Sequence, residues 1–143
     1  MSDSADPDPF GTGPPIDTAV SQPQPGTVLL AVEGEIDTLT APRLEAGLDG
    51  ALDAAQAGNA AVVVDLSRVT FLASSGLAVL IRGAHRATRQ GGRLHLVAAS
   101  RAVIRPLQVT GMDVLFDTHD DVGSALALAA PTDVAPPPGE VGR

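Results

Sequence analysis

The amino-acid sequence predicts one small α/β domain with a mostly parallel β-sheet. Strand-like and helix-like segments alternate along the middle of the chain, which favours parallel pairing of successive strands. The exception is the start, where two strand-like segments follow each other directly, as in a hairpin. The chain has 143 residues, of which 44% are hydrophobic and only 2% aromatic. It therefore has room for one core of aliphatic side chains and little more.

The first elements are a hairpin and a helix. Residues 16–21 form a weak strand candidate, and the turn-forming sequence QPQPG separates it from a stronger one at 27–34. In the following helix, Thr40 is suited to the cap position, Pro42 to the first turn and Gly58 to the end. Leucines and alanines recur between them at helical spacing, which predicts one buried face.

The later elements repeat the alternation. The run AAVVVDLS at 60–67 is continuous and β-branched, as expected for a strand buried on both faces. A helix follows over about 75–90 and stops at Gly91 and Gly92. Three shorter elements and a final helix complete the domain: a strand at 93–99, a helix capped by Ser100 and interrupted at Pro106, a strand at 114–118, and a helix at 120–130.

Both ends of the chain predict disordered tails around a domain at 16–130. Residues 1–15 and 131–143 are rich in Pro, Gly and acidic residues, and such segments bury too little apolar surface to become ordered. The N-terminal segment has no basic region followed by an apolar one, so it does not resemble a signal peptide. No apolar stretch approaches the roughly 18 residues needed to span a bilayer. We therefore expect a cytoplasmic protein.

The joint at 74–76 (Ser-Ser-Gly) interrupts an otherwise apolar stretch. We expect a strand to end near Leu66 and a short loop to carry Phe71 and Leu72 into the core, before a helix begins at the serines. A serine there can cap the helix by accepting hydrogen bonds from free backbone N–H groups. Glycine lets the backbone lie close to whatever docks there, and a helix N-terminus favours an anion.

Three interpretations of this joint compete. In the first, Ser74 is only a helix cap. In the second, a serine is a nucleophile, because the order Ser74, Asp113 or Asp117, then His119 matches that of some hydrolases; however, the pattern G-x-S-x-G is absent. In the third, a serine is phosphorylated and gains about −1.5 to −2 charge. A partner that buried this charge unpaired would lose about 3–5 kcal/mol, on the order of 10²- to 10³-fold in affinity.

Several sequence blocks, in order, resemble the STAS domain, most closely that of bacterial anti-sigma factor antagonists. The blocks are GEID at 34–37 followed by TLTAPRL, then VVVDLSRVTFLASSGLAVLI, GGRLHLV and SRAVIRPLQVTGM. The resemblance covers about residues 16–130 and implies a mixed sheet of four to five strands with about four helices mainly on one face. It also implies partner switching: the unphosphorylated antagonist binds an anti-sigma factor, often a serine kinase, and frees the sigma factor. Phosphorylation by that kinase reverses the binding.

The resemblance also implies site residues. The phosphorylated serine of the family motif D-S-S/T-G corresponds to Ser74, while Ala73 stands where the family usually has Asp. That departure removes a carboxylate that would repel the phosphate. The same carboxylate would also position the serine hydroxyl. The expected partner-binding residues come from the nearby loop, the joint and the next helix: Gly34, Glu35, Asp37, Thr38, Ser75, Gly76 and Arg82.

The implied partners are an anti-sigma factor serine/threonine kinase and a phosphatase. We expect no nucleic acid, membrane or cofactor, and no enzymatic activity of the chain's own. A net charge of −8 disfavours binding to DNA or to anionic membranes. The alternative function is that of a STAS module that is never phosphorylated and docks constitutively in a signalling or transport assembly.

Charge is unevenly distributed along the chain. Residues 66–112 contain seven arginines and no acidic residue. Four of these arginines form a stripe along and beyond the second helix, opposite its predicted core side (Leu77, Leu80, Ile81 and Ala84): Arg82, Arg86, Arg89 and Arg93. The stripe either steers an acidic partner or only keeps the helix soluble.

No metal site is expected. The chain has no Cys, and its three histidines, His85, His95 and His119, lack a metal-ligand spacing. We place His85 on the exposed side of the second helix. The acidic segment 117–121 could attract a cation, but Asp120 or Asp121 better suits the N-terminal end of the last helix.

Overall fold

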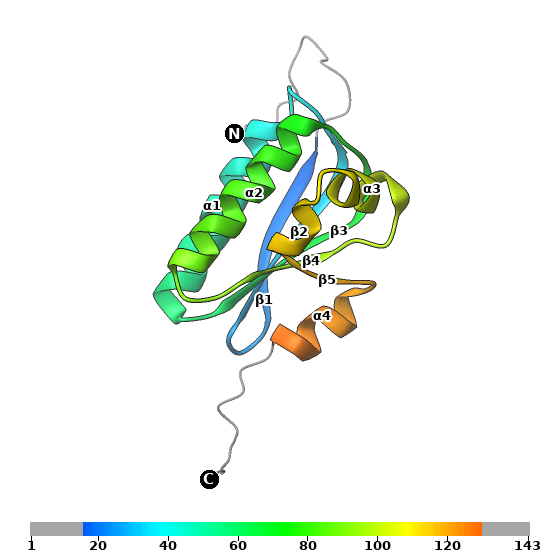
Figure 1. The fold of residues 1–143 in the computed structure, drawn as a ribbon. Helices are drawn as coiled ribbons and strands as arrows, with labels where there is room; N and C mark the ends of the chain where they lie inside the picture. Colours follow the sequence, from blue (N-terminus) through cyan, green and yellow to red (C-terminus); the bar gives the residue numbers. More distant parts are fainter. Residues whose placement is uncertain (1–15, 130–143) are drawn as a thin grey trace.

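The computed structural model describes residues 16–129, which form a five-stranded sheet with helices on both faces (Figure 1). The strand order is β1-β2-β3-β4-β5, so neighbouring strands are also consecutive in the chain. β1 pairs antiparallel with β2, and the other pairs are parallel. This arrangement confirms the predicted mixed sheet with a hairpin at its start. The strands are β1 (Asp17–Gln24), β2 (Thr27–Ile36), β3 (Ala61–Leu72), β4 (Leu94–Val97) and β5 (Asp117–His119).

The predicted tails at 1–15 and 131–143 lie outside the described residues. Among residues 16–129, no helix has the length and apolar character needed to cross a membrane. The helices are α1 (Ala41–Gly58), α2 (Ser74–Arg89), α3 (Arg101–Val109) and α4 (Val122–Ala129), with a short 3₁₀ helix η1 (Met112–Leu115) before β5.

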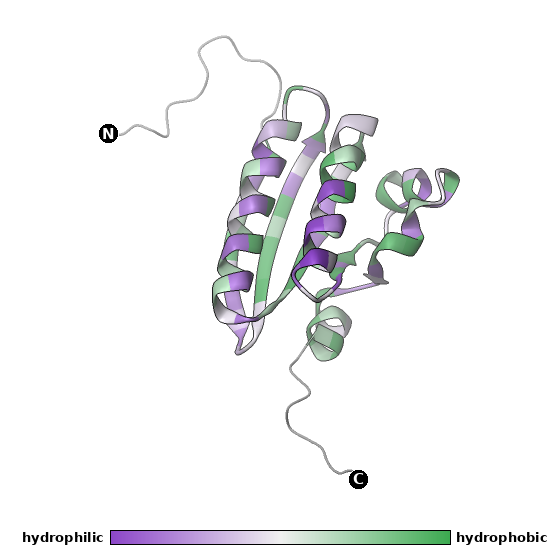
Figure 2. Cartoon of the chain, turned by 60° about the vertical axis from the view of Figure 1, so that its left-hand side comes forward, coloured by the Kyte–Doolittle hydropathy of each residue, from purple (hydrophilic) through white to green (hydrophobic). Residues whose placement is uncertain are grey.

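Helices α1, α2 and α3 cover one face of the sheet, and α4 covers the other (Figure 1). Because alternate side chains of a strand point to opposite faces, Val62 and Val64 of β3 join the large cluster under α1 to α3. Val63 faces α4 instead, in a small cluster with Val97, Ala125 and Ala129. β3 is therefore buried on both faces, as its continuous apolar run predicts. In Figure 2, α1 and α2 carry alternating hydrophilic and hydrophobic bands, whereas α4 is mostly hydrophobic.

The third strand is longer than predicted. β3 continues to Leu72 instead of ending near Leu66, so no loop precedes the joint. Leu72 is buried, as expected, but Phe71 is 49% exposed, and the prediction that it enters the core is wrong. The reason is strand alternation: if Leu72 points into the core, the side chain before it points away.

The last third of the domain also differs in detail. Val114 and Leu115 belong to η1 rather than to a strand, which leaves β5 with only three residues. The Val114 carbonyl oxygen accepts a hydrogen bond from Arg93 Nη2 at 3.1 Å. Helix α3 continues through Pro106 to Val109, so the predicted interruption does not end it.

Candidate functional site

The candidate site lies where β2 and β3 end side by side. Ile36 and Leu72 are register partners, and each strand is followed by a helix on the same face of the sheet. The backbone N–H of Ala73 donates to the carbonyl oxygen of Ile36 at 2.8 Å. This bond joins the last residue of β2 to the residue before α2. In Figure 1 the β2–α1 loop and the start of α2 lie at the same end of the sheet. The structure thus brings together the two segments, 34–38 and 74–76, that the sequence places in one site.

The β2–α1 loop is held by reciprocal hydrogen bonds between Asp37 and Thr40. The Asp37 carboxylate accepts from the backbone N–H groups of Leu39 at 2.9 Å and Thr40 at 3.0 Å. The Thr40 hydroxyl accepts from the Asp37 N–H at 2.9 Å and donates to the Glu35 carbonyl oxygen at 2.8 Å. Thr40 is the N-cap residue of α1, as predicted, but its side chain bonds this loop rather than the first turn of the helix. Asp37 is therefore a structural residue of the loop as well as a predicted docking residue.

The cap of α2 is Ala73, not a serine. Ala73 has the extended backbone typical of an N-cap, with φ −84° and ψ 169°, and the N–H of Leu77 bonds its carbonyl oxygen at 3.0 Å. Ser74 is the first residue of the helix, and no side chain caps it. The prediction that Ser74 or Ser75 caps α2 is thus wrong. The first N–H groups of a helix have no acceptor within the helix. The N–H groups of residues 74–76 are therefore directed out of the N-terminal end of α2.

The two serines differ in accessibility. Ser74 is exposed at the first position of α2. The Ser75 hydroxyl is buried and has no hydrogen-bond partner. Of the two, only Ser74 presents its oxygen to a partner or a kinase.

Both glycines of the predicted site have backbone roles. A Cβ on Gly76 would lie 2.2 Å from Ile36 Cγ2 and 2.9 Å from Leu72 Cδ1. The close approach at Gly76 is therefore made by the chain's own core, whereas the sequence suggested a docked molecule. Gly34 has φ +118°, a conformation that other residues rarely adopt, where the β2–β3 register shifts.

The exposed side chains at this end of the sheet form what we call the Ser74 face. It combines polar groups with two large apolar side chains: Glu35, Thr38, Leu39, Phe71 and Ser74. Leu39 is 65% exposed and Phe71 is 49% exposed. Sequence reasoning did not single out Leu39, although an isolated leucine within the polar loop DTLT was a usable signal. Large apolar groups on an ordered surface are typical of protein interfaces.

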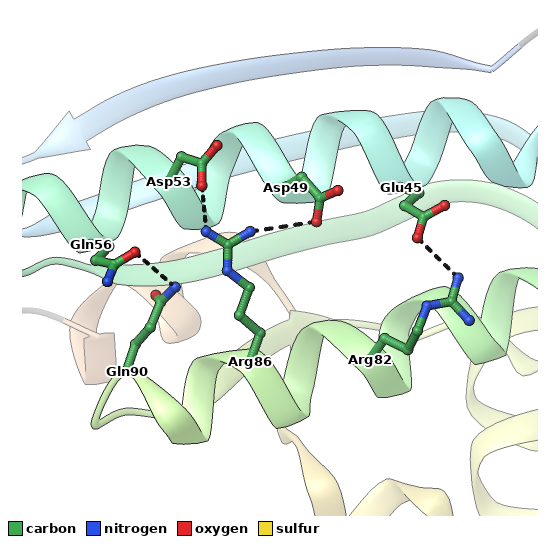
Figure 3. A network of polar contacts seen from close by, with 7 residues as sticks. All are labelled: Glu45, Asp49, Asp53, Gln56, Arg82, Arg86 and Gln90. Atoms are coloured by element: carbon green, nitrogen blue, oxygen red, sulfur yellow. Dashed lines mark hydrogen bonds and ion pairs between the residues drawn. The ribbon is translucent and has the colours of Figure 1, made fainter.

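The arginine stripe is engaged within the chain. Arg82 Nη2 lies 3.1 Å from Glu45 Oε2 of α1, and Arg86 contacts Asp53 and, at 3.5 Å, Asp49 (Figure 3). Beyond the helix, Arg93 Nε lies 2.9 Å from Asp117 Oδ1. These ion pairs account for much of the stripe without an external partner. The side chain of Arg82 is nevertheless 60% exposed, so its predicted partner contact stays a prediction.

Arg82 and Arg86 approach α1 because the two helices pack closely. A Cβ on Gly83 would lie 2.4 Å from Leu48 Cδ2. Farther along, the side-chain amides of Gln90 and Gln56 lie 3.4 Å apart and extend the same row of polar contacts (Figure 3). On the core side of α2, the predicted Leu77, Leu80 and Ala84 are buried, and Ile81 is half-buried. His85 is exposed, as predicted.

The structure gives the hydrolase interpretation no support. The His119 ring bonds His95 on β4, with Nε2 and Nδ1 3.1 Å apart, rather than a serine. Among residues 16–129, no three metal-ligating side chains form a group. Of the acidic residues before α4, Asp121 accepts from the Ser124 N–H at 2.7 Å. This bond and the Ser124 side chain lower the pKa of the Asp121 carboxyl, as befits a helix cap.

Known proteins resemble this chain in sequence. The family model described as the STAS domain matches residues 18–125. The anti-sigma-F factor antagonist RsfB of Mycobacterium tuberculosis is 34% identical over 102 residues, which cover 71% of this chain and 80% of that protein.

Solved structures resemble it in fold. An anti-sigma factor antagonist from Mycobacterium paratuberculosis superposes with a TM-score of 0.71 at 33% identity, over 80% of this chain and 93% of that one. The Bacillus cell fate determinant SpoIIAA, in its phosphorylated form, superposes with a TM-score of 0.61 over 80% of this chain and 100% of that one. At 18% identity, the second likeness shows the shared fold alone.

Proposed function

The chain belongs to the STAS domain family, and we propose on this premise that it is an anti-sigma factor antagonist. Its relatives at 33–34% identity carry that name, and the similarity spans most of both chains. In this role the unphosphorylated protein binds an anti-sigma factor through the Ser74 face and so frees a sigma factor. It acts by binding, in the cytoplasm, without catalysis of its own.

We propose further that phosphorylation of Ser74 switches the binding off. The observation that carries this step is the position of Ser74: it is exposed, first in α2, and next to a cap residue without a polar side chain. A phosphate there would find backbone N–H donors of residues 74–76 within the first turn. The fold therefore tolerates the modification.

The partner does not tolerate it equally well. A complex that covers the Ser74 face would have to bury about −1.5 to −2 charge in an interface that also contains the apolar Leu39 and Phe71. The penalty of about 3–5 kcal/mol for an unpaired buried charge corresponds to on the order of 10²- to 10³-fold weaker affinity. Such a change is large enough to separate a bound from a free state at cellular concentrations.

The partner in this proposal is an anti-sigma factor that is also a serine/threonine kinase, and a phosphatase restores the binding form. Glu35, Thr38 and Arg82 contribute exposed polar contacts to the docking surface. The structural residues Asp37, Gly34 and Gly76 shape that surface from within.

The test is phosphorylation by the cognate anti-sigma factor with Mg²⁺ and ATP, followed by intact-mass analysis and calorimetry of complex formation. We expect one phosphate, lost in Ser74→Ala and retained in the matched variant Ser75→Ala. The phosphorylated protein should bind at least 10²-fold more weakly, as an order of magnitude. A protein that forms the complex but stays unmodified would instead be the constitutive docking subunit. Phosphate on another residue would overturn the assignment of Ser74.

A further inference from the structure

Two histidines bond to each other on the β4–β5 side of the sheet, away from the Ser74 face. His95 Nδ1 and His119 Nε2 lie 3.1 Å apart, and the ring centroids are separated by 5.3 Å with 25° between the planes. The centroids are much farther apart than the facing nitrogens, and the planes are inclined by only 25°. The rings therefore meet end to end, as in a hydrogen bond, rather than face to face.

This geometry limits how many protons the pair can hold. A neutral imidazole has one N–H donor and one acceptor nitrogen, whereas both nitrogens of a protonated ring are donors. The bond between His95 and His119 needs a hydrogen on one facing nitrogen and a lone pair on the other. When both rings are protonated, all their nitrogens are donors, so the bond is broken and two positive charges face each other.

Burial opposes a positive charge on the pair, and the nearby carboxylates offset this only in part. His119 is only 8% exposed. Burial lowers the pKa of His95 from 6.5, and the charges of His119 and Arg93 lower it further, while Asp117 opposes them. Asp117 is already paired with Arg93 at 2.9 Å. The charged groups around the pair come from the loop before β4, from η1, and from β5 and the residues after it: Arg93, Asp113, Asp117, Asp120 and Asp121. Helix α4 adds no charged group.

The bond anchors a lightly held part of the fold. β5 is a three-residue edge strand, and α4 follows it after two residues. α4 packs on Val63 and Val97 through a small cluster only, in which Ala125 and Ala129 are buried and Val122 and Leu126 are partly buried. One side-chain hydrogen bond, from Gln24 Nε2 to the Leu126 carbonyl oxygen, ties α4 to the hairpin.

We propose that the His95–His119 pair is a proton-sensitive latch that holds residues 117–129 on the sheet near neutral pH and releases them in acid. His95 binds its proton less readily in the closed form than in the open form. The stabilisation is therefore complete above about pH 6.5 and is lost as the pH falls below that value. This device lies outside the proposed docking surface and does not depend on it.

The test is amide hydrogen exchange of the full chain between pH 7.5 and 5.0, expressed as protection factors so that the intrinsic pH dependence of exchange cancels. Protection of residues 117–129 should fall by up to about tenfold per pH unit below 6.5, while that of β2 and β3 stays constant. The pKa of the Asp121 carboxyl is lowered by its hydrogen bonds to Ser124, so this group does not gain a proton in the same interval.

Two variants and one spectroscopic readout complete the test. His95→Gln replaces the half-buried ring by a non-titrating amide and should flatten the pH dependence. The matched variant His85→Gln, at an exposed position of α2, should retain it. Ring ¹⁵N shifts of the wild type should show that both rings become protonated over the same pH interval. Equal loss of protection in all strands, an unchanged dependence in His95→Gln, or loss of protection without ring protonation would each overturn the latch.

Discussion

The backbone N–H of Ala73 donates to the carbonyl oxygen of Ile36 at 2.8 Å, across the ends of two neighbouring strands. This bond fixes the start of α2 against the loop that carries Asp37 and Leu39. Three residues later, Gly76 lies directly on Ile36. These backbone contacts fix the position of Ser74 relative to the exposed Leu39. The surface offered to a partner is therefore preformed.

A side-chain cap at position 73 should stabilise the protein. Ala73 has cap geometry but no polar side chain, so Ala73→Asp should raise the free energy of unfolding by about 1 kcal/mol. Urea denaturation measures the change. Ala73→Asn is the neutral control: equal gains identify hydrogen bonding as the cause, and a gain for Asp alone identifies charge at the helix terminus. No gain in either variant would mean that water already satisfies these N–H groups fully.

Adding one methyl group at position 76 should destabilise the fold. The Cβ of Gly76→Ala would collide with Ile36 Cγ2 at 2.2 Å in a packed core, for which a loss of about 1–3 kcal/mol is expected. Gly50→Ala is the matched control, because nothing lies within 4 Å of its Cβ in the interior of α1. That change should instead stabilise by about 0.5–1 kcal/mol. Similar melting curves for the two variants would contradict this account of Gly76.

The apolar groups of the Ser74 face should carry much of the binding energy. Leu39→Ala and Phe71→Ala should each weaken binding to the anti-sigma factor by about tenfold or more, as for anchor residues of an interface. Because both side chains are largely exposed, the folding stability should change little. Val109→Ala, 72% exposed at the end of α3, is the control and should bind normally. Calorimetric titration would contradict the proposal if all three variants bound alike.

A single negative charge at position 74 should mimic part of the switch. Ser74→Asp carries less charge than a phosphate, so affinity should fall by about tenfold or more, below the loss caused by phosphorylation. The control is Ser74→Asn, because the asparagine side chain has nearly the shape of aspartate but no charge. It should bind more tightly than Ser74→Asp. Equal binding of the two variants would assign the effect to shape instead of charge.

Two arginines of α2 should have different roles: Arg86 should affect folding stability, and Arg82 should affect partner binding. Arg86 contacts two carboxylates of α1 and is 24% exposed, so Arg86→Gln should lower stability by up to about 1 kcal/mol, less in high salt, and leave partner affinity unchanged. Arg82→Gln, at a 60% exposed side chain nearer Ser74, should weaken binding a few-fold. If association of Arg82→Gln matched the wild type at low salt, Arg82 would have only its internal role.

The order of elements follows from local patterns, and the sequence predicts it well. Alternating apolar segments predict each strand and helix, and the uninterrupted run at 60–67 correctly predicts a strand buried on both faces. The expectation that the serines and Asp37 lie in one site came from the family resemblance. The structure places both segments at the same end of the sheet.

The details that sequence reasoning missed depend on contacts between distant residues. Ala73 becomes the cap because its N–H bonds Ile36, 37 positions earlier in the chain. Phe71 points outward because β3 continues alongside β2 past the register shift at Gly34. The arginine stripe found its partners on α1, which only the packing of the two helices reveals. A signal did exist there, since Glu45, Asp49 and Asp53 recur every four residues, like Arg82 and Arg86.

Strand order and chain order coincide across the whole sheet. During synthesis from the N-terminus, each emerging strand can therefore add to an edge that is already in place, and no later segment has to be inserted between two earlier ones. The connections to be closed are the short hairpin turn, two crossovers of one helix each, and a third that holds α3 and η1, which keeps the entropy of each closure low. The nascent chain can thus assemble progressively on the ribosome, and within residues 16–129 α4 is the last helix to be added.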